Sequence, residues 1–283
     1  MSARALVETI ELVAADGYRL AADLARPGVA PHTAVLVAPA MGVPRELYRR
    51  WLVHLSEHGF AALVIDYRGI GDSAPKSLRG FDATLTDWAR LDLQAGLDEL
   101  GQRFPGVPKV WFGHSIGGQL LGLMAGDRPV ERALLVASQH GHWRHWTGMR
   151  RLGIWALWHA MPAITRLAGR LPMAAMGQGL DVPAGAARQW AEWGRDRRYI
   201  GKTAAELPDA AFHQGTFPIR AISIVDDEYA PPASIPPLLV LYKQARTEII
   251  RLHPEAEGMN RIGHFGAFRR PLLWMPWVKF LRG

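Results

Sequence analysis

Cysteine is absent from the 283-residue sequence. Its absence excludes disulfide bridges, thiolate metal sites and a cysteine nucleophile, and it leaves the redox compartment open. Lysine is also scarce, with five among the 33 basic residues, and no run of basic residues exceeds two. Nucleic-acid-binding proteins usually concentrate their charge on one face, so the net charge of +7 indicates a basic surface without a nucleic-acid site.

Long apolar runs are missing as well. No stretch reaches about 18 uncharged apolar residues, so we expect no membrane-spanning helix. Arg4 and Glu8 interrupt the N-terminus before an apolar segment typical of a signal peptide could form. We therefore expect a cytoplasmic protein. Internal repeats and low-complexity segments are also lacking, and the sequence predicts no particular oligomeric state.

The apolar segments that are present alternate with amphipathic ones. Residues 7–25 alternate in hydropathy around Asp16-Gly17, which predicts a hairpin with a type I′ turn. Helical patterns and continuous apolar runs then follow in turn, as expected for buried strands linked by crossover helices. The sequence predicts an α/β fold with a mostly parallel sheet and helices on both faces. The expected strands are 33–38, 60–65, 109–112, 132–137, 220–225 and 247–252, and the expected helices are 44–58, 83–103, 119–125 and 268–281.

The alternation stops between residues 139 and 217. This segment is helical in pattern and contains six of the eleven tryptophans. We expect residues 1–138 and 218–283 to form one core domain, with 139–217 as an inserted, tryptophan-rich helical cap. The tryptophans fall in pairs spaced three apart, which places each pair on one helix face. Their packing against the core competes with a second interpretation, an apolar pocket lining. They are Trp143, Trp146, Trp155, Trp158, Trp190 and Trp193.

A candidate nucleophile lies in Gly113-His114-Ser115-Ile116-Gly117. The pentapeptide G-x-S-x-G is a weak signal alone, but here a strand pattern precedes it and a helix pattern follows. In that setting a sharp turn exposes the Ser115 hydroxyl, and side chains at positions 113 and 117 would collide with neighbouring elements. We therefore predict Ser115 as the nucleophile of a serine enzyme.

With this motif the sequence resembles the α/β-hydrolase superfamily over nearly its whole length, and it is similar to a bacterial group of predicted serine hydrolases of unassigned substrate. The resemblance implies an α/β-hydrolase fold with an inserted helical cap, and a triad in the order Ser, acid, His. The other segments that carry it are Asp66–Ser73, Ala40–Val43, Tyr48–Arg50, Trp88–Arg90 and Gly263–Phe265.

The resemblance places the base in Gly263-His264-Phe265, so we favour His264 over His253, which stands beside a proline at a strand end. A serine hydroxyl needs such a base to remove its proton during attack. The acid should lie between the strand at 220–225 and this histidine. The superfamily places a proline four residues after the acid, which selects Asp227, with Asp226 as the alternative and Glu228 behind both.

Two backbone amides should bind the oxyanion. One is the N–H of Ile116, and the other comes from the loop after the strand at 33–38, where the resemblance points to Met41. We expect His114 to serve in packing. Asp66 and Asp72 should stabilise their loop. No metal site is expected, since His140, His142 and His145 lack ligand spacing and nearby carboxylates.

We therefore expect a serine hydrolase without cofactor or metal, acting on a small, uncharged, apolar ester through an acyl-enzyme intermediate. Three alternatives remain open: transfer of the acyl group to another acceptor, amide cleavage as in an aminopeptidase, and a non-catalytic binding protein on the same fold. The apolar stretch 152–164 is too short to span a bilayer, and it suits a mobile lid or an interfacial surface.

Overall fold

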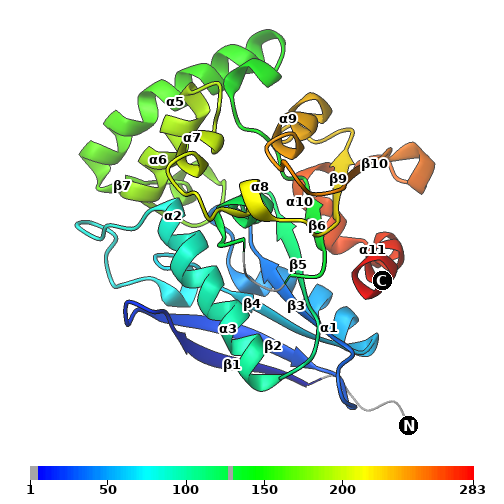
Figure 1. Ribbon diagram of the computed structural model, residues 1–283. Coiled ribbons are helices and arrows are strands. Elements are labelled where there is room, and N and C mark those ends of the chain that lie inside the picture. The colour runs from blue at the N-terminus through cyan, green and yellow to red at the C-terminus, as the bar shows by residue number, and fades with distance from the viewer. Residues whose placement is uncertain (1–5, 127–129) are drawn as a thin grey trace.

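The computed structural model describes residues 6–126 and 130–283. Residues 1–5, which include the Arg4 of the signal-peptide argument, lie outside these ranges. Within them eight strands form one sheet in the order β1-β2-β4-β3-β5-β6-β9-β10 (Figure 1). The pairs β1–β2 and β2–β4 are antiparallel, and the other neighbours are parallel. The strands are β1 (Leu6–Val13), β2 (Arg19–Arg26), β3 (Thr33–Ala38), β4 (Phe60–Ile65), β5 (Lys109–His114), β6 (Ala133–Val136), β9 (Ile219–Ile224) and β10 (Thr247–Leu252).

The mostly parallel sheet confirms the predicted architecture. Strands β3, β4 and β6 are buried at every position, as their continuous apolar sequences predict for strands covered on both faces. The β1–β2 hairpin is also present, but the prediction of a type I′ turn is wrong. The turn spans three residues, and only Gly17 has a positive φ, 84°, whereas a type I′ turn needs two such residues.

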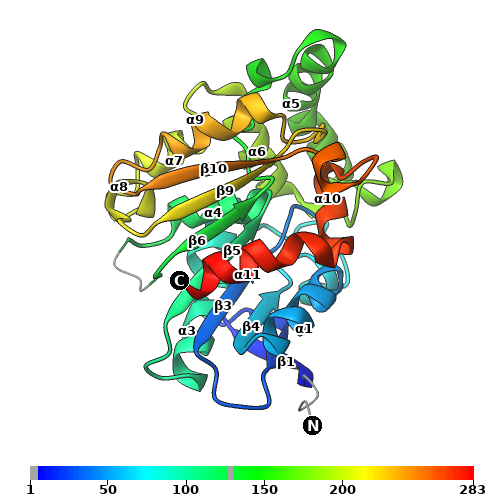
Figure 2. The same cartoon turned by 90° about the vertical axis from the view of Figure 1, so that its right-hand side faces the viewer.

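Helices cover both faces of the sheet. α1 (Arg49–Glu57) and α11 (Trp274–Arg282) lie together on one face, where the Trp51 and Trp274 rings meet at 5.4 Å (Figure 2). α3 (Gln94–Arg103) covers the other face and continues the short α2 (Leu85–Asp87) through a π-helical turn. The last helix begins at Trp274 and not at the predicted residue 268, because Pro271 starts a separate 3₁₀ turn.

The segment between β6 and β9 is helical, as the sequence predicts. It projects beyond the carboxyl ends of the strands (Figure 1). No helix in the described ranges is long and apolar enough to cross a membrane. The segment contains α5 (Gly148–Ala168), β7 (Arg170–Leu171), β8 (Val182–Pro183), α6 (Ala184–Arg195), α7 (Gly201–Ala204) and α8 (Ala211–Gln214). The remaining short helices are α4 (Ile116–Leu120), α9 (Ile235–Leu239) and α10 (Gly263–Gly266).

Candidate active site

Ser115 occupies the sharp turn between β5 and α4. Its φ of 54° lies in the region that L-residues rarely adopt, and its N–H donates to the Val136 carbonyl at 2.9 Å. A Cβ added at Gly117 would lie 2.1 Å from the Ala38 carbonyl oxygen, and one at Gly113 would lie 2.4 Å from the Gly118 Cα. Both collisions were predicted and are confirmed. Glycine at positions 113 and 117, two residues before and two after Ser115, therefore allows Ser115 to take this strained position.

His264 and Asp227 form a buried pair. The His264 Nδ1 lies 2.7 Å from the Asp227 Oδ2, so Nδ1–H donates to the carboxylate and Nε2 is left as the basic nitrogen. The other oxygen of Asp227 accepts hydrogen bonds from the backbone N–H groups of Tyr229 at 2.8 Å and Ala230 at 2.9 Å. Both carboxylate oxygens are thus held. The carboxylate can fix the tautomer and orientation of the imidazole.

Asp226, the alternative acid, has a different set of partners. It accepts hydrogen bonds from the backbone N–H groups of Ile262 and Gly263, each at 3.0 Å. It therefore holds the backbone just before His264 and does not contact the imidazole. The neighbouring Glu228 pairs with Arg150 at 2.7 Å, and His253 is exposed. His264 itself lies in the short helix α10.

No hydrogen bond joins the Ser115 hydroxyl to His264 within the described residues. The two residues nevertheless come from adjoining segments, because His114 Nε2 lies 3.0 Å from the His264 carbonyl oxygen and their rings are 5.0 Å apart. Hydrogen bonds of a catalytic pair are often long without substrate and shorten in the complex. The arrangement thus brings the elbow and the base together without a direct bond between them.

His114 belongs to a chain of hydrogen bonds whose direction is fixed. The Ala40 N–H donates to the Tyr48 hydroxyl at 2.9 Å, and that hydroxyl lies 2.8 Å from His114 Nδ1. Since His264 offers a carbonyl oxygen, His114 Nε2 must carry a proton, and Nδ1 must accept one from Tyr48. Burial and the nearby His264 hold the pKa of His114 well below its usual range, so the ring is neutral as this chain requires.

This chain of hydrogen bonds links three segments that meet at the candidate site: the loop after β3, the elbow and α10. The packing role predicted for His114 is therefore incomplete. Tyr48 was not singled out from the sequence as part of it, since 66 positions separate Tyr48 from His114 and no local pattern connects them.

Met41 and Ile116, the predicted oxyanion donors, are both buried, on the loop after β3 and at the first position of α4. Neither backbone N–H donates a hydrogen bond to another described residue. The free amide of Ile116 at the N-terminus of α4, together with that of Met41 from the loop, suits a developing negative charge. The side-chain composition of the loop does not affect such a contact, since the backbone makes it.

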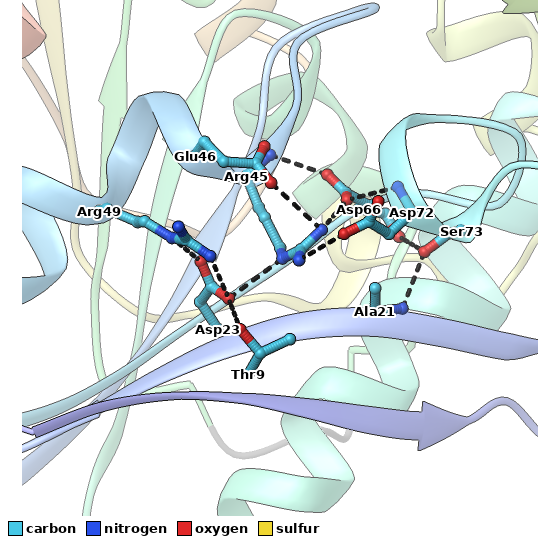
Figure 3. A network of polar contacts seen from close by, with 9 residues as sticks. All are labelled: Thr9, Ala21, Asp23, Arg45, Glu46, Arg49, Asp66, Asp72 and Ser73. Atoms are coloured by element: carbon cyan, nitrogen blue, oxygen red, sulfur yellow. Dashed lines mark hydrogen bonds and ion pairs between the residues drawn. The ribbon is translucent and has the colours of Figure 1, made fainter.

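Asp66 and Asp72 belong to a buried charge network around Arg45, and not to the candidate site (Figure 3). The Arg45 guanidinium pairs with Asp66, with Asp23 at 3.1 Å and with Asp72 at 2.7 Å. Asp66 also accepts hydrogen bonds from the backbone N–H groups of Arg45 at 2.7 Å and Asp72 at 3.1 Å. The predicted loop-stabilising role of both carboxylates is confirmed. With Glu46 they also lie close enough together to ligate a cation, but the Arg45 guanidinium already pairs with all three carboxylates.

The histidines after β6 hydrogen bond to one another. His140 Nδ1 lies 3.0 Å from His145 Nε2, and in the described chain these histidines do not converge as a metal-ligating group. Burial and the neighbouring charges lower the pKa of His140 to about 3 and that of His142 to about 4. Both side chains are therefore neutral near pH 7.

The tryptophans of the segment between β6 and β9 differ in their surroundings. Trp158 and Trp193 are buried and donate to the Gly141 carbonyl at 3.1 Å and the Thr203 hydroxyl at 2.8 Å. Trp158 also packs against Trp190, with the rings 4.7 Å apart. Trp155, by contrast, is 44 % exposed and apart from them. These contacts favour packing for the buried members. The other two are Trp143, which is half-buried, and Trp146, which is buried and donates to the Glu228 carbonyl at 3.0 Å.

A cavity of about 350 Å³ opens beside the imidazole of His264. Tyr229 and Phe265 line it, and their rings lie 5.2 Å and 4.9 Å from that of His264. Two cationic side chains, Arg261 and Arg269, lie on its wall. Glu228 also lines the cavity, whereas Ser115 is not among its lining residues, so the wall beside the base is aromatic with two cationic side chains and one anionic side chain.

Comparison with known proteins identifies the family of the chain. The model of the family described as serine aminopeptidase, S33, matches residues 29–207, which is more than half of the chain. No curated protein matches the sequence.

Solved structures share the fold at low sequence identity. An esterase (EaEST) from Exiguobacterium antarcticum is 17 % identical with a TM-score of 0.62, over 98 % of this chain and 100 % of that chain. A haloalkane dehalogenase loop variant (DbeA-M1) from Bradyrhizobium elkanii is 14 % identical with a TM-score of 0.63, over 99 % and 97 %. DcsB, in complex with its substrate analogue, is 15 % identical with a TM-score of 0.68, over 98 % and 99 %. The predicted α/β-hydrolase fold and superfamily are confirmed.

Proposed function

Because the chain belongs to the serine aminopeptidase S33 family, we propose that it is a serine hydrolase that cleaves carboxylic esters with Ser115, His264 and Asp227. The observation that carries the proposal is the buried hydrogen bond from His264 Nδ1 to Asp227, beside a strained elbow that presents Ser115. Esterases also stand among the proteins that share the fold, which supports this class of reaction.

In the first step the Ser115 oxygen attacks the ester carbonyl carbon, while His264 Nε2 takes the hydroxyl proton. The Asp227 carboxylate stabilises the imidazolium that forms. The carbonyl oxygen becomes an oxyanion, which the backbone N–H groups of Met41 and Ile116 would bind. The tetrahedral intermediate then collapses. Its carbon–oxygen bond to the alcohol breaks, His264 returns the proton to the departing alcohol, and the acyl group stays on Ser115.

In the second step a water molecule replaces the alcohol. His264 Nε2 removes one proton from the water as its oxygen attacks the acyl carbon. Collapse of the second intermediate breaks the bond to Ser115, and His264 returns the proton to the serine oxygen. The products are a carboxylic acid and free enzyme. Neither step needs a redox change.

We further infer that residues 139–217 act as the cap of this site. Trp146 and Arg150 both donate to the Glu228 carbonyl, at 3.0 Å and 3.2 Å, one residue after Asp227. The cap is thereby tied to the loop that carries the acid. The cavity beside His264 has an aromatic wall of Tyr229 and Phe265, which suits an apolar or aromatic part of a substrate that reaches past the base.

An aminopeptidase is the second candidate, and the description of the matching family favours it. A substrate with a free amino terminus needs a carboxylate for its ammonium group. Around His264, Asp227 is engaged by the imidazole and Asp226 by backbone N–H groups. The third carboxylate, Glu228, pairs with Arg150, and Arg261 and Arg269 lie on the same cavity. This charge distribution favours an uncharged ester over a cationic peptide terminus.

Labelling with a fluorophosphonate probe tests the nucleophile. We expect the probe to modify the wild type and not Ser115→Ala, with Ser73→Ala, a buried serine outside the site, as the matched control. Labelling that persists in Ser115→Ala would refute the role of Ser115. Wild-type protein that never reacts would refute the enzyme itself.

Hydrolysis rates then distinguish the two candidate activities. Matched p-nitrophenyl esters and aminoacyl p-nitroanilides offer the same chromophore as an ester or an amide. We expect turnover of the esters, and faster turnover of the anilides would favour the aminopeptidase. Adding an alcohol or an amine and identifying the products distinguishes hydrolysis from acyl transfer.

A further inference from the structure

The outer face of α5 is apolar although it faces solvent. Along it the exposed residues follow helical spacing, and none of them is charged. The largest are Met149 and Leu167, each 80 % exposed, and Leu152, 57 % exposed. Small exposed residues stand between them, at Gly153, Ala156, Ala160 and Ala163. We call these seven residues the α5 outer stripe.

The inner face of α5 is already packed against the rest of the protein. Trp158, Met161 and Thr165 are buried there, and a Cβ added at Gly194 of α6 would lie 2.4 Å from the Trp158 ring. A surface helix normally opposes such an inner face with a polar outer one, so an apolar outer stripe calls for a partner. In Figure 1 and Figure 2 the helix lies at the outer edge of the molecule, away from the sheet.

The charge around the stripe has one sign. The sequence from Arg132 to Leu180 contains six arginines and neither Asp nor Glu. Two of the six pair with residues outside this span: Arg150 with Glu228 at 2.7 Å, and Arg170 with Asp181 at 2.5 Å. Arg144, Arg151 and Arg166 make no ion pair with any described residue. The helix therefore combines an apolar stripe with uncompensated positive charge.

Aromatic side chains stand beside this charge. The Arg144 and Arg151 guanidinium groups lie over the Trp143 ring, at 5.1 Å and 4.8 Å from its centroid. Trp155 is 44 % exposed on α5 itself. Tryptophan and arginine together suit the boundary between lipid headgroups and acyl chains. A second copy of this chain would instead bring arginines against arginines.

We propose that the α5 outer stripe docks on anionic lipid membranes, with α5 lying in the plane of the headgroups. The apolar residues enter the acyl boundary, and Arg144 and Arg166 contact the lipid phosphates. The helix would lie on the membrane without crossing it. The proposal concerns binding alone, so it stands or falls independently of the proposed hydrolase activity.

Co-sedimentation with vesicles tests this docking. We expect the wild type to bind vesicles of phosphatidylcholine with about 30 % phosphatidylglycerol, and to bind pure phosphatidylcholine far more weakly. Replacing Leu152 and Leu167 together by serine should weaken binding at least about tenfold, since both leucines leave the acyl boundary. The matched control replaces Val240 and Leu272 by serine. These are 68 % and 86 % exposed on other elements, and their loss should leave binding unchanged.

Replacing Arg144 and Arg166 by glutamine tests the charge. Each arginine near an anionic surface contributes about 1 kcal/mol, so the double variant should bind about thirtyfold more weakly and lose part of its salt dependence. Wild-type protein that does not co-sediment with anionic vesicles would overturn the proposal. So would a leucine variant that binds as the wild type does. A wild-type dimer that dissociates in the leucine variant would also overturn it, by showing a second copy as the occupant.

Discussion

Replacing Tyr48 by phenylalanine removes one oxygen atom from the chain of hydrogen bonds behind the candidate site. The ring keeps its packing against His114 and Phe268, whose centroids lie 5.9 Å and 5.0 Å away. The Ala40 N–H and the His114 Nδ1 both lose their partner, and both residues are almost fully buried. Leaving a buried polar group unsatisfied costs about 1–3 kcal/mol. For the two groups together, with some relaxation, we expect a loss of about 2–4 kcal/mol in the free energy of unfolding.

Urea unfolding near neutral pH measures this loss, with an unchanged m-value as evidence that the unfolded state is unaffected. The chain offers a close control in Tyr242, whose buried hydroxyl has no hydrogen-bond partner among the described residues. Tyr242→Phe should therefore be neutral or slightly stabilising. If Tyr48→Phe cost no more than Tyr242→Phe, the chain of hydrogen bonds would contribute nothing and our reasoning would be refuted. Should the protein hydrolyse esters, Tyr48→Phe should also lower kcat, because two loops of the site lose their link.

Three further predictions concern the acid, a buried ion pair and pH. Asp227→Asn should lower kcat by about 10³–10⁴, because the imidazole loses its tautomer, whereas Asp226→Asn should cost far less; similar losses in both variants would contradict the assignment. Arg45→Met should destabilise by about 3–5 kcal/mol in urea unfolding, since it leaves buried carboxylates unpaired. The exposed ion pair between Arg19 and Glu11 should contribute only about 0–1 kcal/mol to the free energy of unfolding. If removing Arg19 cost as much as Arg45→Met, the stabilising role of the Arg45 network would be contradicted. His114 has a lowered pKa in the fold, so only the unfolded chain takes up its proton below about pH 6.5. Stability should therefore be full above that pH and fall by up to about 1.4 kcal/mol per unit below it. The fall should be smaller in His114→Gln, and equal slopes in urea titrations would disprove the effect.

Buried carboxylates act in the opposite direction on the pH dependence. Burial raises the pKa of Asp92 to about 7, although the Arg68 guanidinium lowers it. The native state then keeps a proton that the unfolded state loses above about pH 4, so stability falls as the pH rises from about 4 to 7. The His114 slope is therefore measured as a difference between wild type and variant, in which the contribution of Asp92 cancels.

The order of strands and helices could be predicted from the sequence, because parallel sheets bury both faces of their strands and leave continuous apolar runs. The turn types and helix ends could not be predicted as well. The hairpin turn around Gly17 depends on how the two strands are paired, and the last helix begins only after the 3₁₀ turn at Pro271. These features depend on contacts beyond the residues concerned.

The elbow around Ser115 was predictable for the same local reason. Its glycines and serine are consecutive, and the strand and helix that strain the turn flank them directly. The single stretch Lys109–Leu120 thus contains all the information. The exposed face of α5 could not be predicted in the same way. The sequence shows that the segment is apolar, but it does not show whether this face packs against the core or faces solvent.

The sequence by itself determined the candidate nucleophile, its candidate base and a candidate acid within two adjacent residues, since each lies in a short motif with fixed neighbours. Only the tertiary structure showed that Asp227 contacts His264 while Asp226 holds the backbone before it. It also brought Tyr48 to His114 and gathered Asp23, Asp66 and Asp72 around Arg45 (Figure 3). The physical reason is the same in each case. A hydrogen bond between distant segments depends on how the strands are ordered and how the loops pack, and no local sequence pattern records that.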